Sequence, residues 1–280
     1  MEHRNRASGW KHAKLSGHKN EDLVKNLLDN NPQYAKEFLH RLGLSNEMIE
    51  KTSIGGLHET NVPSVNGKRK TKSKTDLKIF LKSGKQVNIS IKKSLGGQVY
   101  FVKSNIFIKT FETQFEKPIP ESVKRAINLF WAGADDALAI IQQYANRNDD
   151  KTYNLQLRHA SVNATTLKNY NEALYHDLLA WFAENMYELT ALSFSMGAAR
   201  DEQEWSHFVW YINLLGENDV DATIPIASLC KKAAKVAEHE TYFSTKNGGT
   251  TIQLPFGFVQ WHQGQLQFHH DFYKIRNLFE

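Results

Sequence analysis

Residues 75–92, TDLKIFLKSGKQVNISIK, alternate between apolar and polar side chains on both sides of one glycine. Alternation with a period of two is typical of strands with one buried face, and a glycine between two such runs indicates a hairpin. A three-residue loop, Lys82-Ser83-Gly84, pairs Leu81 with Lys85 and puts the apolar residues of both strands on one face. A two-residue loop would place them on opposite faces. We therefore predict a hairpin in which Asp76 lies directly opposite Ser90.

The polar face of this hairpin brings a carboxylate, a hydroxyl and an ammonium group together. Asp76, Ser90 and Lys92 all project away from the apolar face, and Lys92 is the diagonal neighbour of Asp76. Opposed Cβ atoms in such pairs are about 4.5–5.5 Å apart and diagonal ones about 7–8 Å. One interpretation is an exposed cross-strand ion pair, which contributes little to stability. Glu21, which opens a predicted helix, supplies a second carboxylate for a functional interpretation.

The net charge of +5 conceals an uneven distribution along the chain. Residues 1–125 carry 24 basic and 12 acidic side chains, a net of +12, whereas residues 126–280 carry 11 and 18, a net of −7. Such asymmetry indicates a face that binds a polyanion. The basic run of residues 68–74 leads directly into Asp76. A run of this kind serves nucleic acid, an anionic membrane or an acidic protein, or is a solvated loop.

The run Lys74-Thr75-Asp76, followed by Ser90-Ile91-Lys92, resembles the catalytic core of the PD-(D/E)xK nucleases and is most similar to a type II restriction endonuclease. That family has an aspartate on one strand and an acid-any-lysine triplet on the next. A glutamate on the preceding helix is a common third element, and Glu21 is the matching position. Thr75 stands in place of the family's proline, and Ser90 in place of its acid. The resemblance covers residues 17–103.

The resemblance implies Mg²⁺-dependent hydrolysis of double-stranded DNA at a specific short sequence, leaving 5′-phosphate and 3′-hydroxyl ends. Asp76 is then the principal metal ligand, with the Ser90 hydroxyl or Ile91 carbonyl as a neutral ligand and Glu21 binding directly or through water. Lys92 orients or deprotonates the attacking water. The class also implies a homodimer that cuts both strands of a symmetric site. The residues expected to bind the DNA backbone are Lys68, Arg69, Lys70, Lys72, Lys74 and Lys93.

The resemblance implies an α/β protein with a restriction-endonuclease-like core, a mixed central β-sheet flanked by helices. For the C-terminal half, the sequence pattern predicts helices and a β-hairpin. We expect a basic catalytic half at residues 1–125. The half at 126–280 is expected to serve recognition and dimer contact, within one continuous domain. A hydrophobic share of 41% excludes a disordered chain, and the single Cys230 excludes an internal disulfide. Without a secretory signal or a membrane span, we expect a cytoplasmic protein.

Periodicity predicts the further elements of the chain. Before the hairpin we expect helices at 20–28, capped by Asn20, at 32–42 and near 48–49, then a loop at 53–74. After it we expect a strand at 99–102, helices at 107–115, 122–131 and 137–144, and a long helix at 165–194. The remainder reads as a strand at 208–215, a strand and helix at 224–236, strands at 251–254, 258–261 and 266–269, and a helix at 272–279.

Two further motifs compete for the catalytic assignment. Asp149-Asp150-Lys151 fits an acid-any-lysine triplet, but no strand-like alternation surrounds it, and we interpret it as surface. His262, His269 and His270 suggest a ββα-metal nuclease, although the helix that follows has no histidine; such residues are more often partly buried polar groups of a sheet edge. Two alternative functions remain: a repair or junction-resolving nuclease of the same fold, and a non-catalytic DNA-binding protein.

Overall fold

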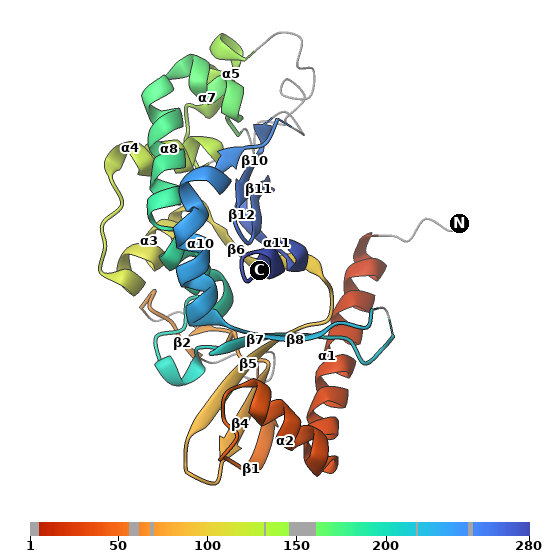
Figure 1. The fold of residues 1–280 in the computed structure, drawn as a ribbon. Helices are drawn as coiled ribbons and strands as arrows, with labels where there is room; N and C mark the ends of the chain where they lie inside the picture. The colour runs from red at the N-terminus through yellow and green to blue at the C-terminus, as the bar shows by residue number, and fades with distance from the viewer. Residues whose placement is uncertain are drawn as a thin grey trace. The chain divides into compact units, whose positions relative to one another are not determined.

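The computed structural model describes residues 6–55, 62–67, 70–131, 133–145, 161–216, 218–245 and 249–280, with side chains from Gly17 onward. The chain forms two compact units that alternate along the sequence (Figure 1). The first comprises Met1–Pro63, Lys70–Leu95 and Phe194–Ile226, and the second comprises Ser64–Arg69, Gly96–Ser193 and Ala227–Glu280. The expected division at residue 125 separated a basic half from an acidic half. The two units are instead defined by contacts between residues, so they do not test that division.

The first unit contains a mixed five-stranded sheet, as the sequence predicts. Its strands lie in the order β1-β4-β5-β7-β8, and β5 and β7 are parallel whereas the other neighbours are antiparallel. The strands are β1 (Ile49–Ile54), β4 (Leu77–Leu81), β5 (Gln86–Lys92), β7 (Phe208–Ile212) and β8 (Asp221–Pro225). Helices α1 (Arg6–Asn30) and α2 (Pro32–Arg41) pack on one face, and the short strands β2 (Val62–Pro63) and β3 (Lys70–Thr71) pair separately.

The β4–β5 hairpin has the predicted register. Leu77 pairs with Ile89 and Ile79 pairs with Val87, so the chain turns through three residues. The Leu81 N–H donates to the Lys85 carbonyl at 2.8 Å, and Gly84 takes a φ of +85°. A left-handed backbone conformation at this position favours glycine, because any residue with a Cβ atom is strained there. The turn therefore fixes which residues of the two strands face each other.

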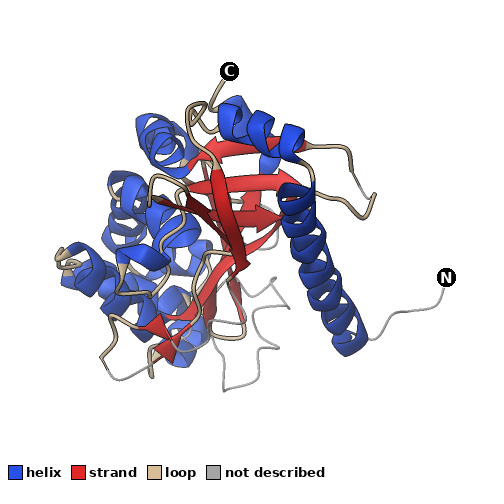
Figure 2. Ribbon diagram, turned by 90° about the horizontal axis from the view of Figure 1, so that it is seen from below, coloured by secondary structure: helices blue, strands red, loops and turns tan. Residues whose placement is uncertain are grey.

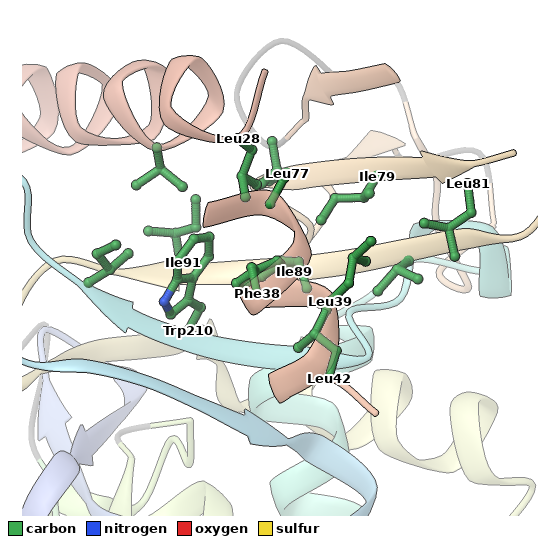
Figure 3. Packing of buried hydrophobic residues seen from close by; sticks show 14 residues of the cluster. Leu28, Phe38, Leu39, Leu42, Leu77, Ile79, Leu81, Ile89, Ile91 and Trp210 are labelled. Atoms are coloured by element: carbon green, nitrogen blue, oxygen red, sulfur yellow. The ribbon is translucent and has the colours of Figure 1, made fainter. Parts of the chain in front are cut away.

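The apolar face of the hairpin forms the core of the first unit (Figure 3). Leu77, Ile79 and Ile89 are fully buried there. The rings of Phe38 from α2 and Trp210 from β7 pack beside them with centroids 4.1 Å apart. Burial of each large apolar side chain contributes about 1.5–3 kcal/mol. This core holds the hairpin in one orientation, with its polar residues on the opposite face.

Two expectations for the N-terminal region are wrong. Helix α1 is one long element that begins at Arg6 and continues past Gly17, so Asn20 lies inside it and is not its cap (Figure 2). The fully buried Asn20 side chain bonds instead to the end of β7, donating to the Ile212 carbonyl at 3.0 Å. The predicted short helix near Met48 is the start of strand β1, because its pairing with β4 outweighs the local helical pattern.

The predicted helix at 165–194 is broken, and the predicted loop at 53–74 holds strand pairs. Asn171 caps a new helix by accepting a bond from the Leu174 N–H, and Asn185 separates two further segments. Asparagine favours caps over helix interiors, since its side chain bonds the nearby backbone. The resulting helices are α7 (Ala164–Tyr170), α8 (Glu172–Glu184), α9 (Met186–Ala191) and a π-helix at Leu192–Met196. Within 53–74, β2 and β3 form a short ribbon.

The second unit contains an antiparallel sheet in the order β6-β12-β11-β10-β9. The strands are β6 (Gly96–Lys103), β9 (Tyr242–Phe243), β10 (Thr251–Leu254), β11 (Gly257–His262) and β12 (Gln265–Asp271). The other helices are α3 (Ser104–Phe115), α4 (Glu121–Phe130), α5 (Ala137–Tyr144), α10 (Ile226–Glu240) and α11 (Phe272–Asn277). Phe268 packs against Phe107 and Phe182 on the helix-covered face. None of the described helices is long and apolar enough to cross a membrane.

Candidate active site

Asp76 stands at the entrance to β4 and is fixed by its own backbone. Its N–H donates to the Ile89 carbonyl at 2.9 Å, and its carbonyl accepts from the Gly55 N–H at 3.0 Å. Its Oδ2 atom accepts the Ile91 N–H at 2.7 Å and the Ser90 hydroxyl at 3.1 Å. The carboxylate is therefore oriented by two donors on the neighbouring strand.

Lys92 completes a chain of polar contacts with Ser90 and Asp76. Its Nζ donates to the Ser90 Oγ at 2.6 Å and to the Ile91 carbonyl at 3.3 Å, and it lies 3.8 Å from the Asp76 Oδ2. The Lys92 and Asp76 side chains are only 18% and 22% exposed. Partial burial strengthens their attraction compared with a surface ion pair. The structure thus brings Asp76, Ser90, Ile91 and Lys92 together as the register requires.

Thr75, the residue directly before Asp76, has a structural role at this site. It is fully buried, and its Oγ1 donates to the Glu204 carbonyl at 3.0 Å. The Ser73 hydroxyl donates to the same carbonyl at 3.1 Å. The approach to Asp76 is thereby held against residues 204–206, which are far away in the sequence.

Residues 203–207 cover the polar face of the hairpin, a feature that local sequence patterns do not reveal. Lys78, 8% exposed, donates from its Nζ to the Glu204 Oε1 at 2.8 Å. The fully buried Asn88 donates from its Nδ2 to the carbonyls of Gln203 and Trp205 at 2.7 and 2.9 Å. Burial lowers the pKa of His207, whose Nδ1 accepts the Asn88 N–H. The catalytic candidates consequently lie at the rim of a covered sheet.

Lys74 is the second cationic residue of this neighbourhood. Its side chain is partly buried, and a Cβ at position 197, where Gly197 stands, would lie 3.0 Å from its Cε. Burial is the main reason that the pKa of Lys74 falls to about 7, with the charge of Lys92 lowering it further and that of Asp76 partly offsetting both. The expected contact of Lys74 with the DNA backbone stays a prediction. Its place beside Asp76 gives it an electrostatic role within the site.

Glu21 lies in α1 at the end of the sheet that also holds the end of β5. Asn20, its neighbour, bonds both the Ile212 carbonyl and the Leu214 N–H. Strand β7, which Ile212 ends, runs parallel to β5. The Glu21 Oε2 lies 3.3 Å from the His18 Nδ1. Its role as a third acidic element stays a prediction.

The other predicted positions are distributed as follows. Lys70 and Lys72 are exposed and Lys93 is partly exposed, whereas Lys68, Arg69 and the Asp149-Asp150-Lys151 triplet lie outside the described residues. His262 and His269 are half-buried on one sheet face, and His270 is buried. In the part of the chain that the structure describes, no group of three or more His, Cys, Asp or Glu could hold a metal ion. The described site therefore offers one carboxylate together with neutral oxygens.

No family model matches the chain, and no curated protein matches it. The chain is similar to a solved structure of the restriction endonuclease MspI in complex with its cognate DNA, at 10% sequence identity and a TM-score of 0.49. That alignment covers 95% of this chain and 100% of the other. A likeness of this size leaves the function to be argued from the site.

Proposed function

We propose that the protein is a Mg²⁺-dependent endonuclease of the type II restriction kind, which hydrolyses phosphodiester bonds in double-stranded DNA at a specific short sequence. One observation supports this above all. Asp76, Ser90 and Lys92 form a partly buried chain of contacts of 2.6–3.8 Å on the polar face of a hairpin. A carboxylate beside a lysine at that spacing is suited to holding a hard cation and a nucleophilic water together.

The donor set at this position fits Mg²⁺. This ion prefers oxygen ligands and takes one or two carboxylates, with waters and substrate phosphate oxygens completing its octahedron. Asp76 would be the principal ligand, the Ser90 hydroxyl or Ile91 carbonyl a neutral one, and Glu21 a ligand directly or through water. When bound, the ion would neutralise the phosphate and make water more acidic. With serine in place of the second acid, we expect a high Mg²⁺ requirement.

The residues of this chain would carry out the remaining work. Lys92, held in place by the Ser90 Oγ, would orient the attacking water and stabilise the charge that develops on the phosphate. The water oxygen forms a bond to phosphorus while the bond to the 3′-oxygen breaks, and a proton passes to that oxygen. The products are a 5′-phosphate and a 3′-hydroxyl.

The remaining predictions concern DNA and the partner subunit. Lysines around the site would contact the DNA backbone, because phosphate contacts position a duplex without reading its sequence. A homodimer would present two such sites to the two strands of a symmetric sequence. The exposed Lys70 and Lys72 and the partly exposed Lys93 suit that electrostatic role.

The test is digestion of plasmid DNA of known sequence with Mg²⁺, followed by mapping of the ends. Asp76→Ala and Lys92→Ala should each reduce cleavage by at least a hundredfold. Lys85→Ala is the matched control, because Lys85 lies on the same hairpin, its side chain is 69% exposed and it pairs with Glu47. The control should cleave as the wild type does. If both site variants cleave normally, the site is wrong.

The same assay separates the two alternative functions. A repair or junction-resolving nuclease would cut branched or damaged duplexes in preference to plasmid, with the same dependence on Asp76 and Lys92. A non-catalytic DNA-binding protein would bind duplex DNA and leave it intact with Mg²⁺, Mn²⁺ and Co²⁺. In that case Asp76 and Lys92 form only an ion pair.

A further inference from the structure

Within the described residues, helices cover one face of the second unit's sheet, and the other face is open except where Lys274 of α11 donates to Gln253. Val259, Leu266 and Phe268 are fully buried on the covered face. In Figure 1, helices α3, α4 and α8 lie on one side of this sheet. Residues of the other face are half-buried or exposed, and Phe101 on β6 is 57% exposed. Directly opposed residues of an antiparallel pair share a face, so the register defines this open face.

The open face is rich in amide side chains. Gln260 on β11 pairs with Gln267 on β12, which in turn pairs with Phe101. In the next row Phe258 pairs with His269, and at the end of the sheet Lys103 pairs with Gln265. Glutamine, histidine and lysine all offer hydrogen-bond donors, and glutamine and neutral histidine also offer acceptors.

The open face carries one acidic residue, Asp271 at the last position of β12, although its half of the chain is acidic. No Asp or Glu occurs between Glu240 and Asp271, a stretch that includes β9, β10, β11 and all of β12 except its last residue. Asp271 stands at the end of β12, where its Oδ1 accepts the N–H groups of Tyr273 and Lys274 and caps α11. The rows from Lys103 and Gln265 to Phe258 and His269 carry no carboxylate of their own, so they add no charge repulsion to phosphates.

Contacts between these side chains pre-arrange them. The Gln260 Nε2 donates to the Gln267 Oε1 at 3.2 Å and lies 3.3 Å from the His269 Nε2. The His269 ring stacks on Phe258 with centroids 4.6 Å apart and an interplanar angle of 8°. Burial, with the neighbouring His262, lowers the pKa of His269, which favours the neutral ring that both donates and accepts. The Gln260 oxygen and the Gln267 amide nitrogen take no part in these contacts.

We propose that this amide face of β6, β11 and β12 docks on double-stranded DNA and reads base edges. Glutamine pairs bidentately with adenine, and strands that lie in a groove are an established way of reading a duplex. Single-stranded nucleic acid is the less suitable occupant. Binding of single strands relies on stacking platforms within a basic groove. Here the ring of Phe258 is already stacked, and amides outnumber lysines. The proposal rests on the proposed function for its choice of ligand.

The experiment is selection of duplexes from a random-sequence pool by the full chain in EDTA, where Mg²⁺-dependent cleavage is blocked. The double variant Gln260→Ala/Gln267→Ala removes the central pair. The double variant Gln142→Ala/Gln143→Ala is the matched control, because it makes the same change at exposed positions of α5. The isosteric Gln267→Glu variant carries the test if the alanine variant does not fold. Competition with single strands of the same sequence identifies the form that is bound.

We expect the wild type and the control to enrich one short consensus. The alanine variant should bind that duplex at least tenfold more weakly, with unchanged affinity for a scrambled duplex, since each base-edge contact discriminates by roughly tenfold or more. An unchanged consensus and affinity in the face variants would overturn the proposal, as would no duplex binding or a preference for single strands.

The outcomes also separate this proposal from the nuclease assignment. If the wild type cleaves DNA but the Gln260→Ala/Gln267→Ala variant selects the same consensus, only the proposal that this face reads bases is refuted. Face-dependent duplex binding without Mg²⁺-dependent cleavage refutes the nuclease alone.

Discussion

Replacing Lys74 by methionine tests the electrostatics of the site independently of any activity. Methionine keeps the length of the stem that packs beside Gly197 and removes the amine. Folding lowers the pKa of Lys74 from 10.5 to about 7, so the unfolded chain holds the proton more tightly than the folded one. Between these two values the unfolded state carries more protons. The free energy of unfolding of the wild type must therefore rise with pH across this window.

The magnitude follows from the size of the shift. Each pKa unit corresponds to 1.36 kcal/mol, so a fall from 10.5 to about 7 destabilises the folded protein by at most roughly 5 kcal/mol below pH 7. The penalty is lost as the pH rises toward 10.5. We expect Lys74→Met to be more stable than the wild type at pH 7. That advantage should shrink by roughly 1 kcal/mol between pH 8 and pH 9.

Urea unfolding at pH 7, 8 and 9, followed by tryptophan fluorescence, measures this difference. Lys72→Met is the control, because Lys72 is exposed and lies two residues away in the same segment. Its stability relative to the wild type should not change with pH. A Lys74→Met advantage that is absent at pH 7, or that stays constant from pH 7 to 9, would refute the electrostatic argument for Lys74.

Three further substitutions test other parts of the argument. On the proposed function, Ser90→Asp adds a second carboxylate and should lower the Mg²⁺ concentration for half-maximal cleavage severalfold. An unchanged or raised requirement in a metal titration contradicts the proposed ligand set. Asn20→Ala leaves the Ile212 carbonyl and the Leu214 N–H without their partner and should lower the free energy of unfolding in urea by about 2–4 kcal/mol. A decrease below 0.5 kcal/mol, about the scatter of surface substitutions, contradicts this. Gly257→Ala should lower the melting temperature by roughly 5 °C or more, because the new Cβ would clash with the His269 carbonyl oxygen and the backbone has a φ of +153° there. An unchanged melting temperature contradicts this.

The hairpin was predictable because its determinants are local. Alternation fixes the faces of both strands, and Gly84 fixes the loop, so the position of Asp76 opposite Ser90 follows from residues 75–92 alone. Strand β6 and helix α3, which follow the hairpin, were predicted from the same kind of local pattern, whereas β1 before it was not. Local periodicity also predicted β10, β11 and β12. Strands β11 and β12 are joined by a tight turn at Gln263-Gly264, in which both residues take positive φ.

Other features depend on contacts between distant residues, which local patterns do not encode. Strand β5 pairs in parallel with β7, more than 100 residues later, and the covering segment 203–207 reaches Lys78 and Asn88 only through that pairing. Asn20 shows the same limit. Its local context indicates a helix cap, but its amide is used by the end of β7.

The net charge of the site depends both on the neutral serine at position 90 and on whether the Lys74 amine is protonated. One carboxylate beside two fully charged lysines would leave the site positive before any divalent cation approached, and that charge would repel the cation. Because the pKa of Lys74 lies at about 7, its amine is largely neutral above that pH, and Asp76 then balances Lys92. A new carboxylate at position 90 would attract the Lys74 proton and raise its pKa again. The effects of Ser90→Asp and Lys74→Met on the Mg²⁺ requirement should therefore not add, since the two groups act on one shared charge.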